Sequence, residues 1–191
     1  MAQGQIEKGA LGRELAQIQF SRLYREQGWA ILAYALRRVE DREDAADVVA
    51  ETFLIAWRRL AEVPAGTEAR LWLYAVARRT IANLHRSERR RTRLGGRLAE
   101  SLRTELATQP TRDGEAAEAL RAMGELGDED RELLLLVAWE GLSPSEAAKV
   151  LAISSLAARS RLHRARRRLR TLIEGDNTAH QNPELDTEEA R

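Results

Sequence analysis

The stretch GLSPSEAAKVLAISSLAARSRLHRARRRLRTLI, from Gly141 to Ile173, decides the fold of this chain. Near its start, Ser143 and Glu146 match a capping box, in which each side chain bonds the backbone N–H of the other residue. Pro144 suits the first helical position, where no N–H is needed. These three residues predict a helix of about two turns.

A tight turn and a longer helix are expected next. Ala152 to Ser154 form the predicted turn, and the second helix begins near Ser155. Its apolar residues recur at spacings of four and three and predict one buried stripe, made of Ala158, Leu162, Ala165, Leu169 and Leu172. The opposite face holds Leu156, Arg159, Ser160, His163, Arg164, Arg167 and Arg170. This order predicts a helix-turn-helix, whose second helix enters the major groove of DNA.

The basic face of that second helix favours a nucleic acid as its partner. Seven arginines and no acid lie between Arg159 and Arg170. The alternative is a basic helix that contacts only solvent, but such a helix usually carries acidic partners four residues away. We expect Arg159 and His163 to contact base edges. The arginines further along, Arg164, Arg167 and Arg170, are expected to contact phosphates.

The composition sets the class of protein. The chain has 191 residues, of which 43% are apolar and 32% charged, so it can bury a core. It has no cysteine, which excludes disulfide scaffolds, thiolate zinc sites and cysteine nucleophiles. Its longest apolar runs have seven residues, whereas a membrane span needs about 20. We therefore expect no membrane insertion and a cytoplasmic location.

The periodicity along the chain is helical almost throughout, with no convincing alternation of the kind that marks a strand. The predicted fold is all-α, with two small helical domains joined by a flexible linker and the helix-turn-helix in the second domain. The expected segments are a loosely ordered N-terminus (1–17), a first domain (18–92), the linker (93–115), a second domain (116–174) and a disordered acidic tail (175–191).

A second basic block lies on a helix predicted from Glu68 to Arg91. Its expected outer stripe has spacings of four and three and consists of Trp72, Val76, Arg79, Asn83, Arg86 and Arg90. An aromatic ring can stack on an unpaired base, an amide can recognise its edge, and guanidiniums can hold the backbone. The alternative for Trp72 is burial against a neighbouring helix. Two separated basic blocks on a chain of net charge +1 indicate two contacts with a polyanion.

An acidic helix is predicted from Glu43 to Leu60. Its expected outer face carries Asp44, Asp47, Glu51, Leu54 and Arg58. Acids beside an exposed leucine suit a basic, partly apolar partner helix. The alternative is a charged face that contacts only solvent.

Three strings in this order resemble the small two-domain extracytoplasmic-function (ECF) sigma factors of bacterial RNA polymerase. They are DREDAADVVAETFLIAW (Asp41–Trp57), RLWLYAVARRTIANLHRSERRR (Arg70–Arg91), and LGDEDRELLLLVAWEGLSPSEAAKVLAIS followed by RSRLHRARRRL. The resemblance covers Phe20 to Ile173 and keeps the order and spacing of the strings. It implies a protein that binds core RNA polymerase and directs promoter recognition, melting and transcription initiation.

The resemblance also implies roles for single residues. Those at the polymerase contact are Asp44, Asp47, Glu51, Phe53, Leu54 and Trp57. Those at the melted minus-ten element are Trp72, Arg79, Asn83, Arg86 and Arg90, with the loop Ala61–Thr67 at the place where the family captures a flipped base of the non-template strand. Those at the duplex minus-thirty-five element are Ser155, Arg159, Ser160, His163, Arg164 and Arg167. An anti-sigma factor is a further implied partner, whereas a metal or cofactor is not implied.

The chain departs from the family pattern at a few positions. Ala50 stands where glutamine is usual, and Arg79 stands where asparagine is usual. Leu156, Ala157 and Ala158 replace a frequent Gly-Thr-Val at the start of the recognition helix. These departures bear on one polymerase contact and on the promoter sequence.

Two other functions are open on the residues alone. One is a stand-alone helix-turn-helix DNA-binding transcription regulator, which would bind a duplex operator tightly without polymerase. The other is a small helical enzyme, but the three histidines, His85, His163 and His180, have no carboxylate at metal or triad spacing. We therefore expect the chain not to be an enzyme.

Overall fold

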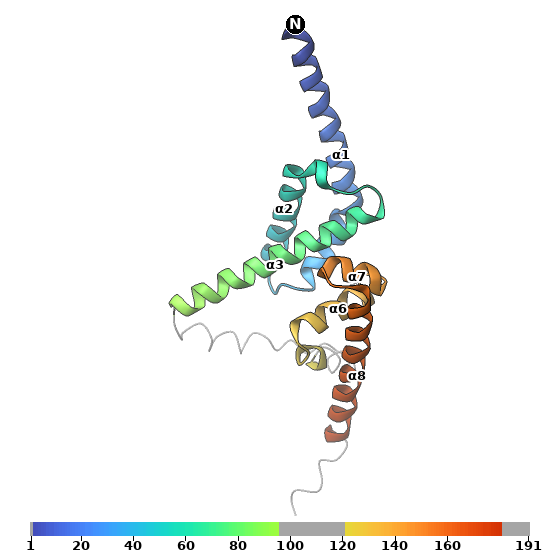
Figure 1. Ribbon diagram of the computed structural model, residues 1–191. Coiled ribbons are helices and arrows are strands. Elements are labelled where there is room, and N and C mark those ends of the chain that lie inside the picture. The colour runs from blue at the N-terminus through green and yellow to red at the C-terminus, as the bar shows by residue number, and fades with distance from the viewer. Residues whose placement is uncertain (1, 96–120, 181–191) are drawn as a thin grey trace, which may run out of the picture. The chain divides into compact units, whose positions relative to one another are not determined.

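The computed structural model describes residues 2–95 and 121–180, and the side chains of 12–89 and 121–174 within them. All regular structure in these ranges is helical, which confirms the predicted fold class there. The contacts divide the chain into two units, Met1–Gly96 and Arg97–Arg191 (Figure 1). The expected linker lies outside the described residues from residue 96 onward. None of the helices described is long and apolar enough to cross a membrane.

The first unit packs three helices against one another. They are α1 (Ala2–Leu36), α2 (Arg42–Arg58) and α3 (Thr67–Gly95), with a short 3-10 helix, η1 (Leu60–Glu62), between α2 and α3. Each of the three α-helices contacts the other two. The largest fully buried side chains of this unit are Ile31, Tyr34, Val48, Thr52, Leu73 and Tyr74. Each of the three α-helices therefore contributes side chains to the core.

Helix α1 is longer than its apolar pattern predicts. The sequence predicts helix from about Ile18 and loose order before it, whereas α1 begins at Ala2 (Figure 1). Leu15 and Ile18 are 59% and 62% exposed, so packing does not hold this part of the helix. Residues 2–17 contain no proline. The polarity of this segment therefore does not mark the end of the helix.

The start of α2 is fixed by a side-chain cap. Asp41 has an extended backbone, and its carboxylate accepts a hydrogen bond of 2.9 Å from the backbone N–H of Glu43. Such a cap satisfies an N–H that has no partner within the helix. The acids Glu43 and Asp44 lie in the first turn, where the positive end of the helix dipole favours them.

The second unit contains the predicted helix-turn-helix. Its described helices are α6 (Asp128–Ala138), α7 (Pro144–Leu151) and α8 (Ser155–His180), and all three contact one another. Helix α8 runs seven residues beyond Ile173 into the segment predicted as a tail. Residues 181–191 of that tail lie outside the described residues. The core side chains include Leu133, Leu136, Ala147, Ala158 and Leu162.

The predicted capping box is present at the start of α7. The backbone N–H of Glu146 donates to Ser143 Oγ at 3.3 Å, and the backbone N–H of Ser143 donates to Glu146 Oε2 at 2.8 Å. A left-handed Gly141, with φ of +66°, turns the chain from α6 toward this start. Local chemistry alone therefore places the first helix of the motif.

The turn between α7 and α8 is a Schellman motif built on an alanine. Ala152 has φ of 54° and ψ of 42°, and its N–H bonds the Lys149 carbonyl at 3.2 Å. The N–H of Ile153 bonds the Ala148 carbonyl at 3.0 Å. This geometry usually has glycine at the left-handed position, because a Cβ there costs about 1–2 kcal/mol. The turn is therefore strained at Ala152.

We expect Ala152→Gly to raise the free energy of unfolding of the second unit by about 0.5–1 kcal/mol. The gain is the relief of left-handed strain minus the larger entropy that glycine loses on folding. Calorimetry on the full chain measures it as a higher melting temperature for that unit. In the control, Ala157→Gly in the first turn of α8, the same change should lower the stability. A loss of stability with Ala152→Gly would contradict the strain.

Candidate nucleic-acid interfaces and partner surface

Helix α8 presents the predicted recognition residues on its exposed side. Arg159, Ser160, His163, Arg164 and Arg167 are all exposed, whereas Ser155 in the first turn is half-buried. The buried stripe on the other side is made of Ala158, Leu162 and Ala165. The packing of this stripe against α6 and α7 leaves one basic face open to a partner.

The first turn of α8 is held by a cap. The backbone N–H of Ala157 donates to Ser154 Oγ at 3.1 Å, so Ser154 serves as the N-cap of the helix. This hydrogen bond fixes the position of the residues that are expected to reach bases.

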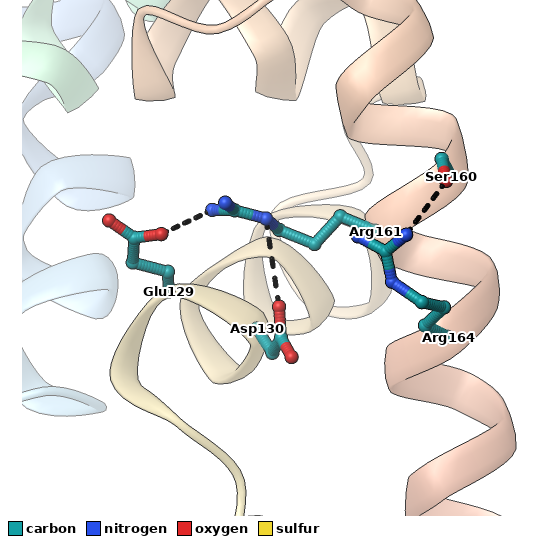
Figure 2. Close-up of polar contacts among 5 residues, drawn as sticks. All are labelled: Glu129, Asp130, Ser160, Arg161 and Arg164. Atoms are coloured by element: carbon teal, nitrogen blue, oxygen red, sulfur yellow. Dashed lines mark hydrogen bonds and ion pairs between the residues drawn. The ribbon is translucent and has the colours of Figure 1, made fainter.

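Arg161 of α8 contacts acids of a neighbouring helix and does not belong to the exposed basic face. Its Nη1 lies 2.5 Å from Glu129 Oε2, and its Nε lies 3.7 Å from Asp130 Oδ1. Figure 2 shows its side chain reaching away from α8 toward these two carboxylates on α6. The guanidinium therefore ties α8 to α6. No local pattern in the sequence predicts this contact, because Glu129 and Arg161 are 32 residues apart.

Arg164 bonds along its own helix instead. Its Nη1 donates to Ser160 Oγ at 3.2 Å, as Figure 2 shows. A guanidinium has five N–H donors, so this bond orients Arg164 and leaves other donors for a phosphate. No ion pair joins Arg159, Arg164 or Arg167 to an acid within the part of the chain described here.

The basic stripe on α3 is shorter than predicted. Arg79, Asn83 and Arg86 are exposed, but Trp72 is half-buried and Val76 is buried. The reason is that α3 packs against both α1 and α2, which widens its buried face. The side chain of Arg90, at the far end of the predicted stripe, lies outside the described residues.

Asn83 and Arg86 are joined on this stripe. Arg86 Nη2 donates to Asn83 Oδ1 at 2.6 Å, and Arg86 Nε donates to the Ala82 carbonyl at 3.1 Å. The bond to Asn83 uses the amide oxygen, so the amide nitrogen is the atom that can donate to a base. The pair holds an amide and a guanidinium in one place on the exposed side of α3.

A second ion pair lies beside Trp72. Arg59 forms a bidentate hydrogen-bonded pair with Glu62, and the guanidinium carbon of Arg59 lies 6.0 Å from the centre of the Trp72 ring. The hydrogen bond from Arg59 lowers the pKa of the Glu62 carboxyl and raises the pKa of Arg59. Both groups are therefore charged at neutral pH. The arginine offsets a negative charge that would otherwise repel an approaching nucleic acid.

A cavity of about 360 Å³ opens between α1 and the loop that precedes α3. Gln19, Arg22 and Gln27 line it from α1, and Val63 to Thr67 line it from the loop. Gly66 in this loop has φ of +65°, a left-handed conformation that favours glycine. The loop predicted to hold a flipped base therefore borders this cavity.

The acidic face of α2 consists of Asp44, Asp47, Glu51, Leu54 and Trp57. Asp47 and Glu51 are exposed, Asp44 is half-buried, and Leu54 and Trp57 are 41% and 45% exposed. This face combines negative charge with apolar area. It suits a partner that is basic and partly apolar.

Phe53 does not belong to this face. It was expected at the polymerase contact, but it is only 3% exposed. Its ring packs edge-on against Tyr24 at 4.8 Å and against Phe20 at 6.2 Å between ring centres. Phe20 also contacts the ring of Trp57 at 5.2 Å. Phe53 therefore lies beneath the acidic face and presents almost no surface of its own.

Comparison with known families and proteins shows clear matches over both units. Residues 15–91 match the family model for sigma-70 region 2, and residues 116–169 match the model for sigma-70 region 4. The chain is 32% identical over 173 residues to the RNA polymerase sigma factor CnrH of Cupriavidus metallidurans, covering 84% of this chain and 90% of CnrH. It is 34% identical over 171 residues to the ECF RNA polymerase sigma factor SigL of Mycobacterium tuberculosis, covering 87% of this chain and 94% of SigL.

A solved structure of one of these relatives also matches this chain. The structure of CnrH in complex with the cytosolic domain of CnrY matches with a TM-score of 0.59 and 28% identity. The match covers 86% of this chain and 97% of the CnrH chain.

We expect Arg161→Met to lower the free energy of unfolding of the second unit by about 0.5–1 kcal/mol, because the methionine keeps the apolar stem but loses the ion pairs. Urea denaturation of the full chain measures the change. The loss should shrink in 1 M salt, which screens exposed charges. The matched control is Arg166→Met, an exposed arginine of α8. An equal loss in both variants would contradict the tie between α8 and α6.

Proposed function

Because the chain belongs to the ECF sigma factors of bacterial RNA polymerase, we propose how its two units divide the work of promoter recognition, melting and transcription initiation. The observation that carries the proposal is the exposed basic face of α8 opposite its buried stripe. As a sigma factor, the chain is a dissociable specificity subunit in the cytoplasm. It is not itself an enzyme and takes no cofactor.

The second unit binds the duplex minus-thirty-five element through α8. Arg159, Ser160 and His163 lie near the capped start of the helix, which is the part of a recognition helix that meets base edges. Arg164 and Arg167 lie further along and contact phosphates, with Ser155 at the first turn. Phosphate contacts release counterions, so this binding weakens steeply with salt.

The first unit captures the melted non-template strand of the minus-ten element. Arg79, Asn83, Arg86 and Arg90 hold its backbone and one base edge, and Trp72 offers the part of its ring that is exposed. The cavity beside the loop Ala61–Thr67 takes a flipped base. Flipping a base costs a few kcal/mol, and stacking contributes about 1–3 kcal/mol per base, so capture offsets the cost of melting.

The acidic face of α2 docks on core RNA polymerase. Asp47 and Glu51 provide the charge, and Leu54 and Trp57 provide the apolar area. Docking places both DNA-binding units on one assembly, which raises the effective concentration of each for its element.

An anti-sigma factor is the proposed regulator of this docking. CnrH has been solved with the cytosolic domain of CnrY, and that relative shares most of its length with this chain. A regulator that covers the acidic face of α2 would exclude the polymerase by competition for the same surface.

We expect the double variant Asp47→Arg with Glu51→Arg to lose binding to core RNA polymerase, because the reversed charges repel a basic partner. Co-purification with core enzyme at low salt measures the binding, and circular dichroism checks the fold. The control carries the same change of charge on two other exposed acids of the first unit, as Glu14→Arg with Glu40→Arg. Retained assembly of the first variant would refute the role of the acidic face.

We expect Arg159→Ala and Arg164→Ala to change promoter binding by the holoenzyme in two different ways. Loss of a phosphate contact at Arg164 should weaken binding to all promoters and reduce the salt slope by about 1. Loss of a base contact at Arg159 should cost about 1–3 kcal/mol on preferred sequences and relax the preference at one base pair. Binding to a set of point-substituted promoter duplexes separates the two. A uniform loss in both variants would mean that neither residue recognises a base.

A further inference from the structure

One apolar side chain stands on the exposed face of the recognition helix. Leu156 is 70% exposed in the first turn of α8. Together with Ser160, His163 and Arg167 it recurs at spacings of four, three and four, so these residues share one stripe along the helix. This stripe runs opposite the buried residues of α8.

The fold does not require a leucine at this position. The core contacts of the first half of α8 come from Ala158, Leu162 and Ala165, which point the other way. Within residues 121–174, Trp139 is the one other large apolar side chain that is strongly exposed. A leucine that faces water among arginines, a serine and a histidine adds no stability to the free chain. We therefore look for its role in the complex with DNA.

The position of Leu156 is fixed before any DNA is bound. It lies between the N-cap Ser154 and the residue Arg161 that ties α8 to α6. Its Cα is therefore held one turn before Ser160, on the part of the helix that enters the major groove. A leucine held there can offer only apolar contact to a base pair.

The major groove presents one apolar group to such a side chain. Among the four bases, only thymine shows a methyl group there, on C5, whereas the other edges show hydrogen-bond donors and acceptors. Leucine next to those polar edges would remove their water without replacing the hydrogen bonds. The chemistry of Leu156 therefore favours thymine over the other three bases.

We propose that Leu156 is a specificity-determining residue, which recognises one thymine of the minus-thirty-five element through its C5 methyl group. This inference rests on the proposed function of α8. It adds a direct contact with a base by a side chain that cannot form a hydrogen bond.

The experiment removes the methyl group alone. Holoenzyme made from the full chain and purified core polymerase first selects its promoter from duplexes with a randomised minus-thirty-five element. Each thymine of the selected element is then replaced singly by deoxyuridine, which lacks only that methyl group, and the affinity is measured by titration. For the wild type we expect a loss of about fourfold at one thymine, which corresponds to about 0.8 kcal/mol, the value of one buried CH₂ group.

The variants assign the effect to a residue. Leu156→Ala should bind the thymine and deoxyuridine duplexes equally at that position, and Leu156→Met should keep most of the discrimination. The matched control is Leu15→Ala, an exposed leucine of the first unit, which should discriminate as the wild type does. Circular dichroism of each variant checks that it is folded.

Two results would overturn the inference, and they differ. If the wild type binds its promoter but responds to no single loss of a methyl group, or if Leu156→Ala keeps the discrimination, Leu156 does not recognise thymine and the proposed function stands. If the holoenzyme selects no element at all, the proposed function of α8 fails, and this inference fails with it.

Discussion

The burial of one stripe of α8 is the constraint on which the rest of the second unit depends. Ala158, Leu162 and Ala165 pack against α6 and α7, and a helix that buries one face must present its other residues to solvent. The arginines on that open face repel one another. In the free chain, the burial of the apolar stripe must offset this repulsion. Arg161 lies at the edge of the stripe and reaches acids of α6. It relieves part of this repulsion and also sets the position of the helix.

Features with local causes were predictable from the sequence, and those with distant causes were not. The capping box at Ser143 and Glu146 and the turn that ends α7 depend on neighbouring residues, so their pattern identifies them. The tie between Arg161 and Glu129 joins two helices that no local periodicity relates. The polarity of residues 2–17 predicts loose order, but the segment contains no proline, and α1 continues through it to Ala2.

The faces of α2 and α3 show what the spacing of apolar residues predicts about burial and what it does not. A period gives the direction of burial but not the width of the buried face, which depends on how many helices pack against it. Helix α3 contacts both α1 and α2, and Val76 is buried although it lies on the predicted outer stripe. On α2 the periodicity placed Phe53 inward, whereas the family resemblance placed it at a partner contact. Its burial against Phe20 and Tyr24 agrees with the periodicity.

The separation of charge along the chain has a consequence for when it binds DNA. The net charge of +1 gives little long-range attraction to a polyanion, and the field of a local basic patch is screened within about 8 Å at physiological ionic strength. The basic faces of α3 and α8 therefore act at contact range and not at a distance. We therefore expect the free chain to be attracted only weakly to bulk DNA, and in the proposed function docking through the acidic face of α2 brings the basic faces within contact range of a promoter. In that proposal the acids of α2 decide when the arginines of α3 and α8 bind DNA.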